Sequence, residues 1–463
     1  MRIRETLRRA ITRTAVIAAL VAPSAGLLAA PQHGGNLNWI VSPEPASIVP
    51  LTTTAGGNCE IGPKIVEGLL TYDPKLNPKP LLATAWSVSK DGLQYRFELR
   101  KGVKWHDGKA FTSADVAFSI QTLKQYHPRG RGTFANVTAV KTPDAHTAIL
   151  VLSKPAPYLL TALAATESPI VPKHLYEGTD ILTNPHNSAP VGTGPFVYKG
   201  WVRGSHIALE RNPEYWDRPK PYLDKVTVRF IPDAAARALA LESGSADLGG
   251  QAIPLSDVER FKASPKFAVD TESEPYLGSQ QQLYFNLDSP ALAKIEVRRA
   301  LAGALDLNAF SKLVWFGYGQ IAASPIGPLI AKYHDANIKP YPYDLKKAEA
   351  ALDAAGYTRG ADGTRFKLRL LWNPFQEKRA AEFVRQSLAR IGVDAVIESY
   401  DFATSVTRVY TDRAFDVTVK SPGRDLTLRY VIVEHSTPRF VRTVARDRFL
   451  TSDDRITVEA DGD

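Results

Sequence analysis

Helix-like and strand-like hydrophobic patterns alternate along this chain from about residue 60 onward, and this alternation constrains the fold more than any other feature. In Glu296–Asp306 the apolar residues recur at the spacing of one buried helix face. Similar patterns predict helices over Lys346–Ala355 and Lys378–Ile391, each followed by a glycine that can end it. Thr112 and Asp115 have the spacing of a capping box and predict the start of another helix.

Strands are predicted in the segments that separate these helices. Apolar residues alternate or run continuously in Tyr95–Leu99, Val226–Phe230, Phe366–Leu371 and Val393–Ile397. Helices and strands in this mixed order predict an α/β protein whose sheets are covered by helices. The 44% hydrophobic and 23% charged shares are ordinary for a globular protein, which excludes a coiled coil and a wholly disordered chain.

Residues 1–30 have the layout of a secretory signal peptide. An arginine-rich start is followed by the apolar run Ala15–Ala22 and by small residues that end at Ala29–Ala30. A permanent membrane anchor is the alternative, but the run is shorter than the ~20 residues that a spanning helix needs. We expect the segment to be removed and the mature chain to be soluble and exported.

The net charge of +9 is partly due to the arginines of residues 1–30, and the rest is scattered along the chain. Nucleic-acid binding requires a concentrated basic face, so we expect no nucleic-acid partner. The single cysteine, Cys59, excludes an intrachain disulfide and a CxxC-type metal site. The histidines form no ligand cluster, and we expect neither a metal nor a cofactor.

Motifs with constrained catalytic spacing are missing from the sequence: it has no GxxxxGK[ST] loop, no HExxH helix and no GxSxG turn. His106 and Asp107 could act as a base with its orienting carboxylate, and Cys59 could act as a nucleophile, which leaves an exported hydrolase as one hypothesis. The competing interpretation is that Trp105–Lys109 forms a turn and that Cys59 is a small packed residue. Gly192–Gly194, flanked by prolines, indicates a turn or hinge rather than a phosphate loop.

Several motifs together resemble the family 5 extracellular solute-binding proteins, the peptide, nickel and opine group that serves ABC importers. The resemblance runs from about Gly34 to Val419, and its motifs occur in the family order. They are Lys104–Thr112, Asp115–Val116, Val191–Phe196, Leu209–Trp216, Leu223–Val226, Ile231–Asp233, Phe285–Asn286, Val297–Leu301, Asp306, Tyr343–Tyr357 and Ile391–Val393.

The resemblance implies an α/β, two-lobed, periplasmic-binding-protein-like type II fold with a subdomain inserted in the first lobe. It implies the following organisation: signal peptide 1–30, lobe one 31–71 and 189–272, inserted subdomain 72–188, lobe two 273–419, and an atypical tail 420–463. The implied function is a monomeric periplasmic receptor that captures an oligopeptide or similar small solute between its lobes and delivers it to an inner-membrane ABC permease.

Ligand-binding candidates follow from where such a fold places its loops, because loops between strands and helices face the crevice. We expect Gly57, Asn58 and Cys59 to line the crevice from lobe one, ahead of a predicted helix over Ile61–Leu70. The candidates of lobe two come from two segments. They are Trp372 and Asn373, which follow a predicted strand, and Tyr284 and Asn286 on the presumed crossing strand. The alternative for Gly57–Cys59 and for Trp372–Asn373 is a purely structural role in turns beside the helices.

Residues 420–463 depart from the family pattern. Arginine replaces lysine almost completely, no helix face can be traced, and the end is polar and acidic. We interpret this change as a frameshift or truncation that leaves lobe two incomplete. A vestigial chain that binds nothing is therefore an alternative to a working receptor.

Overall fold

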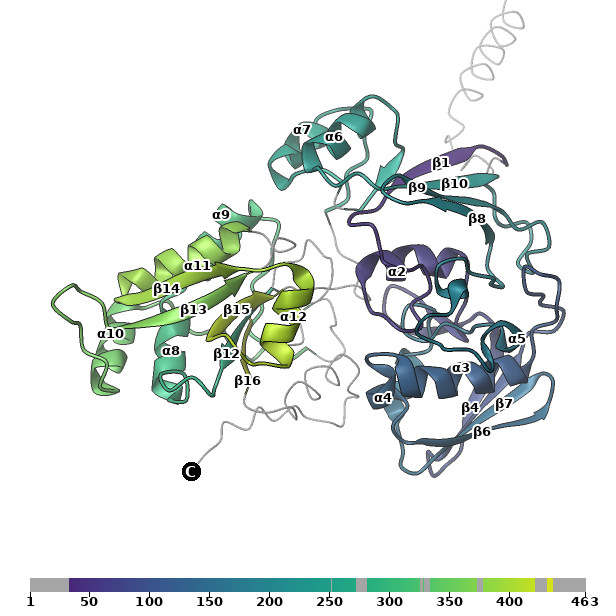
Figure 1. Ribbon diagram of the computed structural model, residues 1–463, viewed down its shortest axis with the longest axis horizontal. Coiled ribbons are helices and arrows are strands. Elements are labelled where there is room, and N and C mark those ends of the chain that lie inside the picture. The colour runs from purple at the N-terminus through teal and green to yellow at the C-terminus, as the bar shows by residue number, and fades with distance from the viewer. Residues whose placement is uncertain are drawn as a thin grey trace, which may run out of the picture.

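The computed structural model describes residues 33–250, 252–271, 281–324, 328, 334–372, 378–420 and 431–435. Two five-stranded sheets, one four-stranded sheet and one two-stranded sheet organise these residues. Figure 1 shows two lobes: the elements from β12 to β16 form one of them, here called lobe two, and the elements from β1 to α7 form the other.

The main sheet of the first lobe has the strand order β11-β1-β10-β9-β8. β1 pairs in parallel with β10 and β11, whereas β9 is antiparallel to both of its neighbours, β10 and β8. The strands are β1 (Asn36–Ile40), β8 (Phe196–Val202), β9 (His206–Arg211), β10 (Lys225–Arg229) and β11 (Leu248–Gly249). The helices and 3₁₀ turns around them are α2 (Gly56–Ile61), η1 (Gly62–Lys64), α6 (Ala234–Glu242), η4 (Leu255–Asp257) and α7 (Val258–Lys262).

Between β1 and β8 the chain forms an antiparallel sheet of order β4-β5-β7-β6. Its strands are β4 (Ala83–Val88), β5 (Gln94–Leu99), β6 (Val137–Asp144) and β7 (Thr147–Leu152), preceded by the hairpin of β2 (Leu70–Tyr72) and β3 (Pro78–Pro80). Its helices and turns are α3 (Ser113–Tyr126), α4 (Gly130–Thr133), η2 (Pro157–Thr161), α5 (Lys173–Tyr176) and η3 (Pro185–Asn187). The predicted capping box of α3 is confirmed, since the backbone N–H of Thr112 donates to Asp115 Oδ2 at 2.9 Å.

Lobe two contains the sheet β14-β13-β15-β12-β16. Its strands are β12 (Gln282–Asn286), β13 (Phe366–Trp372), β14 (Val393–Ser399), β15 (Val417–Lys420) and β16 (Val431–His435). Its helices are α8 (Ile295–Gly303), α9 (Leu307–Trp315), α10 (Leu345–Ala354), α11 (Lys378–Arg390) and α12 (Phe402–Tyr410). One core joins the sheet to α8, α9, α10 and α11 through buried residues such as Phe285, Leu301, Phe310, Leu352 and Val384.

The predicted helix over Ile61–Leu70 is wrong. The helix at this place is α2, which begins at the glycines and ends at Ile61. Pro63 lacks the N–H that a continuing helix would use, and the chain forms a 3₁₀ turn before it extends into β2. The apolar spacing that suggested a helix instead reflects burial in two cores, with Ile61 and Ile65 in one and Val66 and Leu69 in the other.

The region after Val419 contributes one strand to the sheet. β15 ends at Lys420, and β16 pairs in parallel with β12 from Gln282↔Val431 to Asn286↔His435. The sequence patterns did not predict this strand.

Candidate functional site

Two of the motifs that carried the resemblance, Val191–Phe196 and Leu209–Trp216, meet at one buried carboxylate, that of Glu67, which is 3% exposed. Its Oε2 accepts hydrogen bonds from Thr193 Oγ1 at 2.8 Å and Trp216 Nε1 at 3.0 Å, and its Oε1 accepts one from Tyr215 Oη at 2.9 Å. The Arg100 guanidinium stacks 3.9 Å from the centre of the Trp216 ring. Burial outweighs these contacts and raises the pKa of Glu67 to about 7. The hydrogen bonds of the cluster join distant segments of the first lobe, and Arg100, which follows β5 of the four-stranded sheet, packs against them.

His106 is fixed by the backbone of the Gly192–Gly194 turn. The N–H of Gly192 donates to Nδ1 at 3.2 Å, and Nε2 lies 3.0 Å from the carbonyl oxygen of Gly194, to which it donates. Nδ1 therefore acts as an acceptor, which defines a neutral imidazole, and burial lowers the pKa of His106. With both nitrogens engaged, His106 holds the turn in place and does not act as the base of the hydrolase hypothesis. Asp107, proposed as its orienting carboxylate, instead contacts His174 at 2.6 Å.

The Gly192–Gly194 turn lies directly against the backbone of Ile65. A Cβ at Gly192 would lie 1.8 Å from the Ile65 carbonyl oxygen, and one at Gly194 would lie 2.7 Å from it. Because the two backbone segments are so close, the Gly194 N–H can donate a hydrogen bond to the Ile65 carbonyl oxygen at 2.9 Å. These glycines are therefore required by close packing, and the expected turn is confirmed.

The lobe-one candidates Gly57, Asn58 and Cys59 lie within α2 rather than in a loop before a helix. Gly57 is buried, and a Cβ there would lie 3.1 Å from Pro45 Cβ. Asn58 Nδ2 donates to the carbonyl oxygen of Ser47 at 2.7 Å, and Asn58 Oδ1 has no hydrogen-bond partner among the described residues. Cys59 is half-buried, with its Sγ 3.8 Å from the Thr166 carbonyl oxygen. These residues hold α2 against the first lobe.

The lobe-two candidates occupy strand ends and a central strand. Tyr284 lies in β12 and is 5% exposed, and Trp372 ends β13 half-buried against the core of this lobe. Asn286 Nδ2 donates to the carbonyl oxygens of Arg413 at 3.0 Å and Phe415 at 2.8 Å. Its Oδ1 accepts from Arg413 Nη2 at 3.0 Å, so its amide is engaged within lobe two. Asn373 lies outside the described residues.

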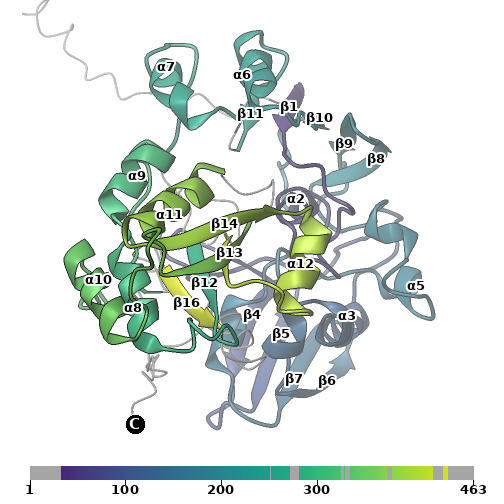
Figure 2. The same ribbon diagram turned by 60° about the vertical axis from the view of Figure 1, so that its left-hand side comes forward.

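The two sets of candidates lie on separate lobes. In Figures 1 and 2, α2 lies on the side of the first lobe that is nearest to α12 of lobe two. Helix α12 was not predicted from the sequence, although Asp401 followed by Thr404 is a recognisable cap: the Thr404 N–H donates to Asp401 Oδ1 at 3.0 Å. The hydrogen bonds of Asn58 and Asn286 described above each stay within one lobe, so the structure does not join the two sets directly.

A cavity of about 310 Å³ lies elsewhere, over the polar face of β1, β9 and β10. None of the candidate residues lines it. Its lining residues are Asn38, Gly204, Ser205, His206, Thr227, Arg229, Phe230 and Ile231.

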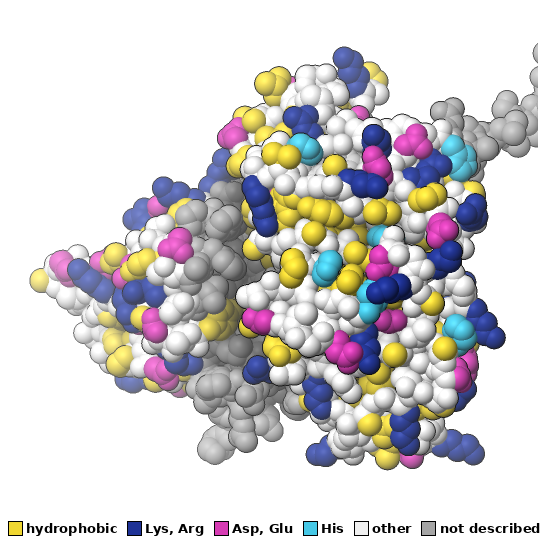
Figure 3. All heavy atoms as spheres, turned by 45° about the vertical axis from the view of Figure 1, so that its right-hand side comes forward, with side chains coloured by type: hydrophobic (Ala, Val, Ile, Leu, Met, Phe, Trp, Pro, Cys, Tyr) yellow, Lys and Arg dark blue, Asp and Glu magenta, His cyan; other side chains and the backbone are white. Residues whose placement is uncertain are grey.

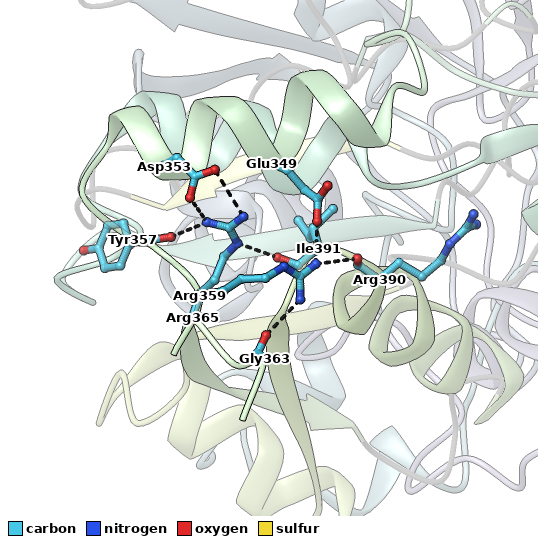
Figure 4. A network of polar contacts seen from close by, with 8 residues as sticks. All are labelled: Glu349, Asp353, Tyr357, Arg359, Gly363, Arg365, Arg390 and Ile391. Atoms are coloured by element: carbon cyan, nitrogen blue, oxygen red, sulfur yellow. Dashed lines mark hydrogen bonds and ion pairs between the residues drawn. The ribbon is translucent and has the colours of Figure 1, made fainter. Parts of the chain in front are cut away.

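Lobe two also contains a polar network that joins the ends of α10 and α11 (Figure 4). Arg365 Nε donates to the Ile391 carbonyl oxygen at 3.0 Å and its Nη1 donates to the Tyr357 carbonyl oxygen at 2.6 Å, while the guanidinium pairs with Asp353. Arg359 pairs with Glu349 in the same network. The Arg365 side chain is only 3% exposed, so its guanidinium is engaged within the fold and stabilises it.

Neither the charges on the face in Figure 3 nor any grouping of metal-ligating side chains indicates a further site among the residues that the structure describes. On the face in Figure 3, Lys and Arg side chains are interspersed with Asp and Glu side chains. Within the described ranges, no three His, Cys, Asp or Glu side chains are grouped so that they could hold a metal ion. The described part of the chain also contains no helix with the length and hydrophobicity needed to cross a membrane.

Comparisons with known proteins give consistent results. The oligopeptide-binding protein AppA of Bacillus subtilis is 30% identical over 399 residues, which cover 82% of this chain and 72% of that protein. The heme-binding protein A of Haemophilus influenzae is 32% identical over 350 residues, or 70% of this chain and 62% of that protein. The structure of the periplasmic binding protein DppA from Helicobacter pylori in complex with the peptide STSA matches with a TM-score of 0.74 at 29% identity, covering 85% of this chain and 79% of that one.

These structural matches confirm the expected two-lobed, type II periplasmic-binding-protein fold. The family model of the bacterial extracellular solute-binding proteins, family 5 Middle, matches residues 77–430, well over half of the chain. The match passes Val419, where the resemblance was expected to stop. The chain therefore belongs to the bacterial extracellular solute-binding proteins of family 5.

Proposed function

We propose that this chain is the peptide-capturing component of an ABC importer. In this proposal it works in the periplasm as a monomer, after removal of residues 1–30, and passes an oligopeptide to an inner-membrane permease. The main support is the structural match to a family member in complex with a four-residue peptide, over 85% of this chain. Family members are binding proteins rather than enzymes, and the proposal requires no covalent chemistry.

The proposed binding surface lies between α2 of the first lobe and the edge of the lobe-two sheet at which β13 ends, with β15 between it and the oppositely directed strand β12. The first lobe contributes Gly57 and Cys59 to this surface, and lobe two contributes Tyr284 and Trp372. A peptide that contacts both lobes favours their approach, because those contacts exist together only in the closed arrangement. Asn58 and Asn286 support this surface from behind through their bonds to the backbone.

The test is a thermal melt of the purified protein with the peptide Ser-Thr-Ser-Ala, with a mixed peptide pool, and with hemin. A ligand that prefers the native state raises the melting temperature, by the equivalent of about 2.7 kcal/mol at a concentration 100 times Kd. A rise with peptide supports the proposal. A melting temperature that rises with hemin alone would indicate heme rather than peptide as the ligand. A cooperative melt that no ligand shifts would favour the vestigial alternative.

Two variants locate the binding surface. Replacing Trp372 by Ala removes a half-buried aromatic side chain at the end of β13 and is expected to weaken peptide binding about tenfold or more. Val396→Ala is the matched control, because Val396 is 47% exposed on the neighbouring strand β14. Equal peptide affinities of the two variants would remove Trp372 from the site.

A further inference from the structure

One side chain of lobe two makes direct contacts with a helix of the first lobe. Tyr318 Oη donates a hydrogen bond to the Glu259 carboxylate of α7. Lys262 Nζ, also on α7, lies 5.0 Å from the centre of the Tyr318 ring and 3.5 Å from Glu259 Oε1. We call these three residues the Tyr318 latch. Figures 1 and 2 show α7 beside α9, the helix that Tyr318 follows.

The lobe-two end of the latch is held firmly. The Tyr318 N–H donates to the Trp315 carbonyl oxygen at 3.0 Å, which fixes the residue in the turn that follows α9. Ser311 Oγ closes this turn by donating to the Gly319 carbonyl oxygen at 3.0 Å. Val314 of the same helix is buried in the lobe-two core. Tyr318 therefore moves together with lobe two.

The other end is fixed to the first lobe. Arg260 of α7 pairs with Glu242 of α6, and its Nη2 lies 2.9 Å from Asp257 Oδ2. Ala240 of α6 packs in turn against Ile40 of β1. The position of α7 therefore reports the position of the first lobe, and a contact between α7 and Tyr318 depends on how the two lobes are arranged.

We propose that the Tyr318 latch stabilises the arrangement of the lobes seen here and so helps to set their distribution before any ligand binds. The Glu259 side chain is 78% exposed, so the contact is weak enough to break when the lobes move. The hydrogen bond from Tyr318 to Glu259 raises the pKa of Tyr318 to about 12, so its Oη keeps its proton at neutral pH. The importance of the latch for transport rests on the proposed function, but its effect on the lobes does not.

The test measures the distance between the lobes by single-molecule energy transfer in the absence of peptide. Dyes are attached to cysteines placed at Val202 of β8 and Val396 of β14, which are 53% and 47% exposed, in a Cys59→Ser background. Tyr318→Phe keeps the ring and removes the donor. We expect this variant to lower several-fold the ratio of molecules at the wild-type interlobe distance to molecules at longer distances. Tyr341→Phe is the matched control, since Tyr341 is 51% exposed and lies outside the latch.

Glu259→Gln removes the charge of the acceptor and is expected to act like Tyr318→Phe, with little added effect when the two are combined. Distances that stay at the wild-type distribution in both variants would overturn the latch, whether or not the protein binds peptide. If the unlabelled wild-type protein, with Cys59 in place, fails to bind peptide while the labelled variants show the shift, the proposed function is overturned and the latch is left intact. Melting temperatures of all variants check that the native state persists.

Discussion

Trp216 Nε1 donates a 3.0 Å hydrogen bond to Glu67 Oε2, and this bond joins the segment after β9 to the segment that leads into β2. Thr193 and Tyr215 donate to the same carboxylate, so three side chains that are distant from Glu67 in the sequence share this one buried acid as their acceptor. Burial disfavours the ionised acid, whereas the three donors favour it. The balance raises the pKa of Glu67 to about 7, which makes the stability of the protein depend on pH.

We expect the free energy of unfolding to fall as the pH rises from about 4.5 to about 7. An unfolded Glu67 loses its proton near its ordinary pKa of 4.5, whereas the folded one keeps its proton until about pH 7. The stability that protonated Glu67 contributes is therefore fully present below pH 4.5 and is lost as the pH rises toward 7, by on the order of 3 kcal/mol. Chemical denaturation at a series of pH values measures the slope.

Glu67→Gln isolates this effect, because an amide can keep the contacts of Thr193 and Trp216 at its oxygen and donate to Tyr215 from its nitrogen. The variant should show a flatter pH profile than the wild-type protein. Glu214→Gln serves as the control, since the Glu214 side chain is 57% exposed. Parallel profiles of wild type and Glu67→Gln would contradict the assignment.

Gly192→Ala is expected to destabilise the protein by about 3 kcal/mol or more. The added Cβ would lie 1.8 Å from the Ile65 carbonyl oxygen, and backbone rather than a flexible side chain would have to move. Gly200→Ala is the control, because a Cβ at Gly200 meets nothing within 4 Å. Urea denaturation of both variants checks this, and an equal, small effect would show that the turn can relax.

The sequence was sufficient to predict the most regular elements of lobe two. Helices α8, α10 and α11 and strands β13 and β14 are confirmed within a few residues, because each buries one regular apolar face. Elements α9, α12, β15 and β16 were not predicted, and two of these failures have clear physical causes. The pattern in Glu296–Asp306 hid the boundary at Asp306, whose side chain accepts a hydrogen bond from the Ala309 N–H at 2.9 Å and starts α9. β16 was not predicted because its pairing with β12 depends on contacts between segments that are distant in the sequence.

The candidate site was less predictable. A motif does not reveal the role of its residues. Trp216 donates a hydrogen bond to Glu67, and His106 and Gly192 bond to each other beside this cluster. Glu67 itself was not predicted as a candidate, since an isolated acid in an apolar segment has no sequence signature. A site formed between lobes depends on residues from separate sheets, and local patterns do not determine how those sheets are arranged.

Arg365→Met should destabilise lobe two by about 2–4 kcal/mol. The change leaves the Ile391 and Tyr357 carbonyl oxygens without the donor that now reaches them at 3.0 and 2.6 Å, and it removes the partner of Asp353 (Figure 4). Lys367→Met, two residues further along in β13 and with its side chain 75% exposed, is the control and should be nearly neutral. Thermal melts of the two variants that coincide would show that other contacts hold the ends of α10 and α11.

Asn286→Ala tests whether Asn286 acts through the fold or through the ligand. Its amide donates to the Phe415 carbonyl oxygen at 2.8 Å and the Arg413 carbonyl oxygen at 3.0 Å, and it is 3% exposed. Loss of these bonds leaves buried carbonyl groups unpaired, so we expect a destabilisation of about 2 kcal/mol. Peptide affinity measured well below the melting temperature should change less than threefold, because no polar atom of the amide is left for a ligand. A large loss of affinity in a variant with unchanged stability would instead place Asn286 in contact with the peptide.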